Sequence, residues 1–397
     1  MKLVAPSTPL RGEVELPVSK SIANRFQIIA ALAGKNISFP DSAPEDVITL
    51  RNALAATTTE VNVGMAGTAM RFLTAYFSIV EERQVLLVGN SRMYKRPIED
   101  LVKALQLLGA GVSYLEEYGF PPLSINGKNL LGGTINMSAS VSSQFVSALM
   151  MIACKMKSGL TINLNGKVLS RPYIELSASC IRQCGIDVHF NGNTIRISSG
   201  EYKIPTLNIE ADWSSASYFY SLICANPKSK LLLKGLNLNS IQGDSIISEW
   251  FKPLGVSSTQ KENGVEIYSS GDIDFPLEMD FKNNPDLAQT FAFLAACLGK
   301  ELKLTGLDNL RLKETDRISA LRTELEKLGL EVLVADNSLE VRGAIKVDSV
   351  TIQTYNDHRM AMSAVVLSNR MELEILNPEV VCKSFPAFWN ELSRVVK

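Results

Sequence analysis

Several helical stretches of this chain follow clusters of positive charge or serine. Lys20, Ser21 and Arg25 open an apolar, small-residue stretch, residues 313–317 (KETDR) precede ISALRTELEKLG, and residues 358–359 (His-Arg) precede MAMSAVVLS. The helix macrodipole disfavours a cation at a helix N-terminus by roughly 0.3–1 kcal/mol, whereas the free N–H groups there bind anions. A chain that accepts this cost repeatedly is expected to form a pocket for a multiply charged anion. We expect that ligand to be phosphorylated or carboxylated.

The composition is that of a large globular protein without an overall charge bias. The 397 residues are 46% hydrophobic and 20% charged, and the formal net charge is -1. This predicts about two domains and, because no basic face exists, no nucleic-acid partner. No stretch reaches the roughly 18 uncharged apolar residues of a membrane span. Residues 1–21 lack the apolar region of a signal peptide, so we expect a cytoplasmic protein.

The cysteines and histidines argue against a metal site. Only two histidines are present, His189 in the alternating stretch IDVHF and His358, which is too few for a histidine-based site. The cysteines show no CxxC spacing and mostly lie in apolar stretches, so we expect them to be reduced and buried. They are Cys154, Cys180, Cys184, Cys224, Cys297 and Cys382.

The elements that must hold the charged clusters form a sixfold repeat. Helical stretches begin near Lys20, Gly67, Ser142, Trp213, Asp286 and Asp357. The last five starts are about 72 residues apart, which indicates repeated structural units. A unit is predicted to run helix, strand, second helix and then short alternating strands. In the unit from Ser142 these final strands are IDVHF, TIRISS and TLNIEA.

The two ends of the chain suggest how the units are grouped. The last unit stops after its second helix, whereas KLVAP and GEVELP near the N-terminus are predicted strands without a preceding helix. We therefore expect these N-terminal strands to complete the last unit. The chain then divides into an N-terminal lobe, 19–210, and a C-terminal lobe, 211–397 with 1–18 added. Crossings near residues 17–20 and 210–212 suit hinge closure around a ligand.

The first unit is shorter than the others by roughly 24 residues. Its second helix, VITLRNALAA, runs almost directly into TEVNVG. Two strands are therefore expected to be missing from one face, while the site is expected to remain.

Nine segments along the chain carry a more specific signal than any single cluster. They are PVSKSIANR (17–25), AGTAMRFL (66–73), SRMYKRPIEDL (91–101), SSQF (142–145), SRPYIE (170–175), PDLA (285–288), NLRLKETDR (309–317), YNDHRMAM (355–362) and CKSFP (382–386). In this order they resemble the 5-enolpyruvylshikimate-3-phosphate (EPSP) synthase family, the 3-phosphoshikimate 1-carboxyvinyltransferases. The resemblance spans essentially the whole chain and is weakest over residues 40–64. It implies an α/β (α+β) inside-out barrel of enolpyruvyl transferase type, with three βαβαββ-type units in each lobe and the first unit truncated.

The resemblance also implies an activity. Members of this family are transferases of the shikimate pathway, which leads to chorismate and the aromatic amino acids. They join phosphoenolpyruvate to the 5-hydroxyl of shikimate 3-phosphate by addition, and then eliminate phosphate. Neither a metal nor an organic cofactor is implied, the two substrates are the expected partners, and a monomer is expected. Such chemistry needs a base, an acid, and cations for two phosphates and a carboxylate.

Two carboxylates are candidates for the proton transfers. Taken alone, Asp286 after Pro285 is typical of an N-cap, and Glu314 within KETDR is typical of a solvated ion-pair cluster. By resemblance, Asp286 takes the proton of the hydroxyl and Glu314 handles the proton of the methylene carbon, with the third catalytic residue, Lys20, alongside.

The resemblance assigns the remaining residues to two half-sites. Arginine offers a planar fork for a carboxylate or phosphate and lysine a compact charge, whereas a serine or glycine before a helix is, taken alone, often a cap. The phosphoenolpyruvate half-site comprises Lys20, Gly67, Arg92, Gln144, Arg317, Arg359 and Lys383. The shikimate 3-phosphate half-site comprises Lys20, Ser21, Arg25, Ser142, Ser143, Gln144, Ser170, Tyr173, Asp286, Asn309 and Lys313.

The chain departs from the family pattern at two positions near Gly67. Met65 stands where Asn is usual, so one polar contact near phosphoenolpyruvate is expected to be lost. Phe72 stands where Pro is usual, and its ring could shift the start of the helix that contains Arg71. These differences leave room for altered kinetics or inhibitor response, but they touch neither Asp286 nor Glu314.

Two other functions remain as alternatives. One is a UDP-N-acetylglucosamine enolpyruvyl transferase, which uses a loop cysteine as its acid. The corresponding stretch here, GNSRMYKRPIED, has no cysteine. In addition, the KETDR motif of this chain would not be expected in that family. The other is a non-catalytic anion-binding paralogue, which would have little reason to keep both Asp286 and Glu314 among the cations.

Overall fold

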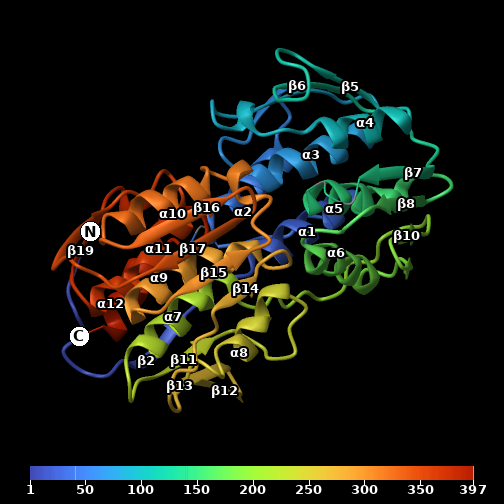
Figure 1. Ribbon diagram of the computed structural model, residues 1–397. Helices are drawn as coiled ribbons and strands as arrows, with labels where there is room; N and C mark the ends of the chain where they lie inside the picture. The colour runs from blue at the N-terminus through green and yellow to red at the C-terminus, as the bar shows by residue number, and fades with distance from the viewer. Residues whose placement is uncertain (41, 139, 141, 397) are drawn as a thin grey trace. The chain divides into compact units, whose positions relative to one another are not determined.

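A computed structural model describes residues 1–40, 42–138, 140 and 142–396 of the chain (Figure 1). These residues form two compact units. The C-terminal unit comprises Met1–Ser19, Ser42–Glu45 and Glu210–Lys397, and the N-terminal unit comprises Lys20–Asp41 and Asp46–Ile209. No helix in the described part of the chain is both long and apolar enough to cross a membrane.

The N-terminal unit contains two four-stranded sheets, with the strand orders β3-β4-β6-β5 and β7-β8-β10-β9. The strands are β3 (Glu60–Asn62), β4 (Gln84–Val88), β5 (Gly111–Tyr114), β6 (Leu123–Asn126), β7 (Gly133–Ser138), β8 (Leu160–Asn165), β9 (Val188–Asn191) and β10 (Thr194–Ile197). The helices are α1 (Lys20–Leu32), α2 (Glu45–Ala55), α3 (Gly67–Ile79), α4 (Glu99–Leu107), α5 (Ser143–Ile152) and α6 (Arg171–Gln183), with 3₁₀ turns at Met93–Lys95 and Ala153–Lys155.

The helices α1, α3 and α5 form the centre of the N-terminal unit. They contact one another, and α3 also contacts β4 and β6 of the outer sheet (Figure 1). Residues of α3 and α5 are mostly small or apolar, which is typical of a buried helix. Most residues of α3 and α5 are accordingly buried.

The C-terminal unit contains three sheets, with the orders β12-β13-β11-β2, β14-β15-β17-β16 and β1-β19-β18. The strands are β1 (Lys2–Leu3), β2 (Arg11–Glu15), β11 (Lys230–Lys234), β12 (Val256–Lys261), β13 (Gly264–Ser269), β14 (Glu278–Asp280), β15 (Leu302–Thr305), β16 (Glu331–Ala335), β17 (Ser338–Arg342), β18 (Ser349–Ile352) and β19 (Glu372–Ile375). The helices are α7 (Trp213–Ala225), α8 (Ile247–Trp250), α9 (Ala288–Leu298), α10 (Arg317–Glu326), α11 (His358–Ala364) and α12 (Phe388–Val395). Short 3₁₀ helices span Gly243–Ile246, Pro285–Leu287, Leu310–Leu312, Val365–Asn369 and Pro378–Lys383.

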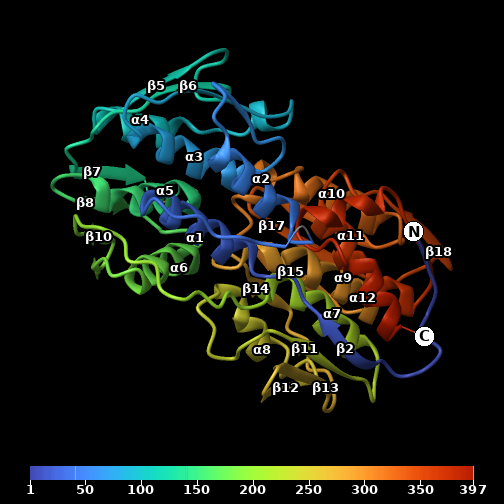
Figure 2. The ribbon, with the colours of Figure 1, turned by 180° about the vertical axis from the view of Figure 1, so that it is seen from behind.

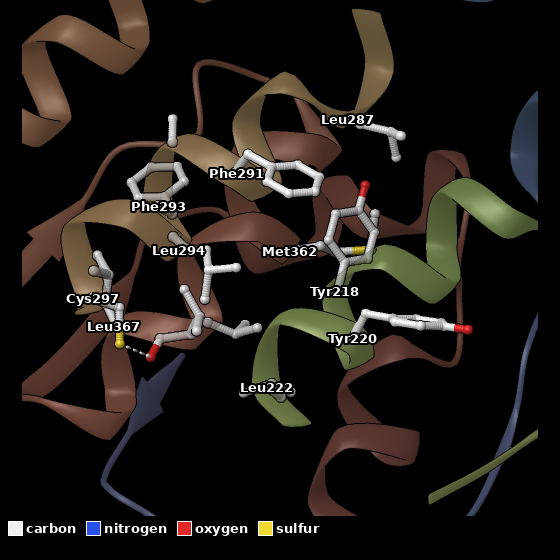
Figure 3. Packing of buried hydrophobic residues seen from close by; sticks show 14 of the residues in the cluster. Tyr218, Tyr220, Leu222, Leu287, Phe291, Phe293, Leu294, Cys297, Met362 and Leu367 are labelled. Carbon is white, nitrogen blue, oxygen red and sulfur yellow. Dashed lines mark hydrogen bonds between the residues drawn. The ribbon is translucent and has the colours of Figure 1, made fainter. Parts of the chain in front are cut away.

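The helices α7 and α11 both pack on α9, which lies in the core of the C-terminal unit (Figure 2). Residues Ala288–Cys297 of α9 are all buried. Figure 3 shows Tyr218 and Tyr220 of α7 near Phe291 of α9 and Met362 of α11.

The N-terminal strands differ from the prediction. They were expected to complete the last unit together, but only β1 does so, by pairing with β19. Strand β2 instead pairs in parallel with β11, in the sheet of the unit that begins at Trp213. Strand β2 therefore has the same place in its sheet as β7 and β14 have in theirs. Each of these edge strands pairs in parallel with the strand that follows the first helix of the unit.

The prediction of a strand at TLNIEA, residues 206–211, is wrong. Residues 206–210 form no strand, and the edge position beside β11 is occupied by β2. Ala211 makes only an isolated bridge with Val18. The backbone bonds there join the two predicted crossings directly, from Ser19 N to Glu210 O (2.8 Å) and from Asp212 N to Pro17 O (2.9 Å).

The truncated first unit has lost more than the two strands predicted. The described residues between α1 and α2 form no strand, and α2 is followed after a short loop by β3. The described strands accordingly form five sheets. Pro40 and Pro44 lie in the connecting segment, and proline removes the N–H donor that a ladder needs.

Candidate active site

The C-terminal unit brings together the starts of three helices. Asp286 lies in the 3₁₀ turn that leads into α9. Arg317 is the first residue of α10, whose N-cap Asp316 accepts bonds from Ile318 N and Ser319 N. Asp357 is the N-cap of α11 and accepts a bond from Arg359 N. The predicted clusters therefore meet in one group of alternating charges.

Arg317 lies at the centre of this group. Its side chain is 1% exposed, and its three nitrogens all donate to carboxylates. Nε donates to Asp357 Oδ2 (2.7 Å), Nη1 to Asp286 Oδ1 (2.9 Å) and Nη2 to Glu314 Oε2 (3.1 Å). Such charge-assisted bonds are strong and directional, so Arg317 fixes the positions of all three acids.

Asp286 is surrounded by cations. Arg359 Nη2 donates to its Oδ2 (2.8 Å), and Lys313 Nζ lies 3.9 Å from its Oδ1. Burial raises the pKa of Asp286, but the charges of Arg359, Lys313 and Arg317 outweigh burial and hold that pKa well below its usual value. Arg359 Nη1 also donates to the hydroxyl of Tyr218 (3.2 Å), whose pKa burial raises to about 12.

Glu314 is held from both sides. Its Oε1 accepts a bond from Lys383 Nζ (2.8 Å) and its Oε2 the bond from Arg317. Lys383 ends the 3₁₀ helix that contacts α11. The side chains of Glu314 and Asp286 are 11% and 19% exposed. Both carboxylates are therefore oriented by buried cations and remain accessible to solvent.

Asp244 is a second buried acid near Asp286 that the sequence did not single out. It accepts bonds from Ser214 Oγ (2.5 Å) and Asn284 Nδ2 (3.0 Å) and is 3% exposed. Burial, with a smaller contribution from the charge of Asp286, raises the pKa of Asp244 to about 6. Its carboxyl group therefore titrates close to neutral pH.

The sequence also missed the roles of Asp357 and Tyr218. Asp357 lies in the motif YNDHRMAM, and the sequence indicated only that a helix starts there. Its position directly before His358-Arg359 is the signal of an N-cap that could have been used. His358 itself points into the protein, with 1% of its side chain exposed and Nδ1 3.8 Å from Asp357 Oδ1.

In the N-terminal unit, the side chain of Lys20 is partly exposed (16%), whereas that of Arg25 is buried. Lys20 opens α1, and its Nζ lies 3.0 Å from Asp46 Oδ2. Arg25 is buried and donates to Ser177 Oγ, Ser147 Oγ and the carbonyls of Ser21 and Tyr173. Burial lowers the pKa of Arg25 to about 10. Its guanidinium thus joins α1 to α5 and α6.

At the start of α3, Gly67 lies against the guanidinium of Arg96. A Cβ atom on Gly67 would overlap the guanidinium of Arg96. Arg96 is 7% exposed, and no described residue accepts a bond from its buried Nε. The N-cap, Ala66, provides no side-chain bond to the helix. This helix start therefore has no side-chain cap and a buried cation nearby.

The neighbouring predicted residues lie at other helix starts of this unit. Ser142 caps α5, and Gln144 Nε2 donates to Thr68 Oγ1 of α3 (3.1 Å). Ser170 precedes α6 with φ +54°, a left-handed conformation that is uncommon outside glycine. Arg92 precedes the turn at Met93–Lys95.

Phe72, the departure from the family pattern, is fully buried in the core of this unit, and α3 still begins at Gly67. Its ring lies 5.5 Å from the guanidinium carbon of Arg25, a distance suited to a cation–π contact. The structure therefore accommodates the larger residue without losing the helix start.

The predicted site residues thus form two groups, one in each unit. Among the predicted residues of the C-terminal unit, direct contacts link Asp286, Lys313, Glu314, Arg317, Arg359 and Lys383. Asn309 lies nearby in the chain, before the turn at Leu310–Leu312. The others belong to the N-terminal unit, where Arg25 lies in the second turn of α1 and the rest lie at helix starts or in first turns: Lys20, Ser21, Gly67, Arg92, Ser142, Ser143, Gln144, Ser170 and Tyr173.

Comparison with known proteins identifies the family. A family model described as EPSP synthase (3-phosphoshikimate 1-carboxyvinyltransferase) matches residues 41–392. The chain belongs to the EPSP synthase family. A 3-phosphoshikimate 1-carboxyvinyltransferase from Bacteroides fragilis is 39% identical over 99% of this chain and 97% of its own length. One from Haemophilus influenzae is 35% identical, with 99% and 98% covered.

Solved structures show the same fold. An EPSP synthase from Acinetobacter baumannii matches with a TM-score of 0.78 at 22% identity, over 100% of this chain and 98% of that chain. The enolpyruvyl transferase NikO from Streptomyces tendae gives 0.74 at 14% identity, with 99% and 96% covered. The predicted enolpyruvyl transferase fold is therefore confirmed.

Membership of the EPSP synthase family also confirms the predicted activity. The chain is a transferase of the shikimate pathway that passes the enolpyruvyl group of phosphoenolpyruvate to shikimate 3-phosphate, on the route to the aromatic amino acids. The family match favours this reaction over the UDP-N-acetylglucosamine alternative.

Proposed function

We propose that Asp286 accepts the proton of the substrate 5-hydroxyl, that Glu314 protonates the methylene carbon of phosphoenolpyruvate, and that Lys20 assists. This assignment depends on one observation: the buried guanidinium of Arg317 donates to both carboxylates. A fixed acid–base pair is what addition followed by elimination requires. Each proton transfer of this kind contributes typically 10²–10⁴-fold to the rate.

The cations around Asp286 have a second role in this scheme. Without substrate they make Asp286 a weak base, because they hold its pKa low. A phosphate or carboxylate of the substrates competes for the same cations, chiefly Arg359 and Lys313. An anion bound there weakens their attraction to Asp286 and raises its pKa. The carboxylate therefore becomes a better base when substrate is present.

The binding residues follow the resemblance, with one shift of emphasis. Phosphoenolpyruvate is assigned to Lys20, Gly67, Arg92, Gln144, Arg317, Arg359 and Lys383. Shikimate 3-phosphate is assigned to Lys20, Ser21, Arg25, Ser142, Ser143, Gln144, Ser170, Tyr173, Asp286, Asn309 and Lys313. For Arg317 the contacts favour holding the acids, because each of its nitrogens already donates to a carboxylate.

The protein is further proposed to act as a monomer in the cytoplasm, with the two substrates as its partners. Its six cysteines are unpaired, and all but Cys382 are buried. Free thiols are the usual state in a reducing compartment.

A coupled assay for inorganic phosphate tests the proposed function. Phosphate should appear only when phosphoenolpyruvate and shikimate 3-phosphate are both present, because elimination follows addition. Release from phosphoenolpyruvate alone would indicate a phosphatase. No release under any condition would support a non-catalytic anion-binding protein.

A further inference from the structure

The turn between β18 and α11 has an unusual backbone. Asp357 N donates to Thr354 O (2.8 Å), and the two residues between them, Tyr355 and Asn356, have φ values of +53° and +56°. Two successive positive φ angles define a turn that normally selects glycine or asparagine. A tyrosine at its first central position is strained and persists only where its surroundings hold it.

A buried glutamate holds this turn. Glu324 of α10 is 0% exposed. Its Oε1 accepts a bond from the Tyr355 hydroxyl (2.5 Å), and its Oε2 accepts bonds from Gln353 N (3.1 Å) and Lys327 Nζ (2.6 Å). The carboxylate therefore binds the turn and the residue before it, with Lys327 as its counter-ion.

The turn leads directly to the arginines of the active site. Asp357, its last residue, binds Arg317 through Oδ2 and caps α11 at Arg359 N. Arg317 and Arg359 in turn donate to the two oxygens of Asp286. A shift of the turn would therefore reach both contacts that orient this carboxylate.

We propose, on the basis of the role assigned to Asp286 above, that Glu324 and Tyr355 are positioning residues for the transferase reaction. Their hydrogen bond fixes the strained turn at 354–357, the turn fixes Asp357, and Asp357 fixes the arginines that aim Asp286. Neither side chain touches Asp286 itself in the contacts described above, so their effect passes through the arginines.

The chain offers a matched control for this role. Glu391 of α12 is 3% exposed, and its carboxylate also binds one backbone N–H, of Glu15 (3.0 Å), and one cation, Arg394 (2.5 Å). Replacing either glutamate by alanine removes a buried anion and leaves similar groups without a partner. The bonds of Glu391, however, tie α12 to β2 and do not involve the turn.

The experiment compares E324A, Y355F, their double variant and E391A. For each, the melting temperature, kcat per folded protein and the Kd for shikimate 3-phosphate are measured. We expect kcat to fall about tenfold or more in E324A and Y355F, because small misplacements of reacting groups are costly. The Kd should change less than threefold, because most predicted shikimate 3-phosphate ligands lie in the N-terminal unit. E391A should lose stability but keep its kcat.

The double variant tests the shared bond. If Glu324 and Tyr355 act through it, the loss of kcat in the double variant is smaller than the product of the two single losses. Unchanged kcat in both Y355F and E324A overturns the proposal, as does an equal loss of kcat in E391A. Y355F removes only a hydroxyl and decides the question if E324A fails to fold. An inactive wild-type protein would instead refute the proposed function.

Discussion

At the scale of single residues, the buried carboxyl group of Asp244 is a measurable consequence of the site. Its folded pKa of about 6 exceeds its ordinary value of 3.8, so the folded protein binds more protons than the unfolded chain between about pH 4 and pH 6. Stability is therefore lost as the pH rises through this window, and the whole penalty is present above it.

The variant D244N should remove this penalty. Its amide cannot ionise and still accepts the bond from Asn284. We expect D244N to be more stable than the wild type at pH 7, by on the order of 3 kcal/mol, and to show no such advantage at pH 4. Urea unfolding at the two pH values measures this difference. Equal advantages at both would contradict the raised pKa.

Arg359 is the residue that the charge pattern singled out most directly. Its bonds to Asp286 and Tyr218 need the planar fork of arginine. Because charge-assisted bonds are worth about 1.5–3 kcal/mol, R359A should lose roughly tenfold to a hundredfold in kcat/KM while keeping its fold. R359K, which keeps the charge but not the fork, should lose activity as well. Full activity in R359A would remove the assignment.

At the scale of elements, the helix start at Gly67 makes a prediction for the N-terminal unit. The Cβ atom of G67A would displace the guanidinium of Arg96. We expect the KM for phosphoenolpyruvate to rise, with little change in the Kd for shikimate 3-phosphate. The double variant G67A/R96Q removes the overlap while keeping a polar side chain. The G67A substitution should therefore raise the KM for phosphoenolpyruvate less in the R96Q background than in the wild type.

An equal effect of G67A in both backgrounds would mean that the added methyl group obstructs the ligand directly. A KM unchanged by G67A would exclude any close approach of phosphoenolpyruvate to this helix start.

The helix starts were predictable from the sequence, whereas part of the strand pairing was not. Helices begin at Lys20, Gly67 and Trp213, because small, apolar stretches of helical length and period are local signals. The partner of β2 is β11, more than 200 residues away in the chain. Alternation identifies a strand but not its neighbour, so β2 was assigned to the last unit instead of the sheet of β11. TLNIEA also alternates and was wrongly predicted to be a strand.

The same limit applies to the site. Asp286, Glu314 and the cations lie in recognisable segments, but their pairing depends on tertiary packing. Asp244 follows a stretch without periodicity, and only the fold brings it near Asp286. Tyr218 contacts Arg359 of the distant helix α11, and Glu324 contacts the loop residues Gln353 and Tyr355. No local pattern could therefore reveal their roles.

At the scale of the whole molecule, closure of two lobes around the ligand stays a prediction of the sequence. At the two predicted crossings the backbone is joined by the bond from Ser19 N to Glu210 O, and the chain also enters the C-terminal unit at Ser42–Glu45, which the sequence did not predict. Small-angle X-ray scattering tests closure, because a closed form is more compact. We expect the radius of gyration to fall when shikimate 3-phosphate and inorganic phosphate are added. Identical curves with and without these ligands would contradict closure.

The turnover of D286N and E314Q shows directly whether these two carboxylates perform the proton transfers. Both substitutions keep the size of the side chain, and folding is checked by circular dichroism. We expect kcat for phosphate release to fall at least about a hundredfold in each variant, as for loss of a general acid or base, while shikimate 3-phosphate still binds. A folded D286N or E314Q with near wild-type kcat would contradict this assignment.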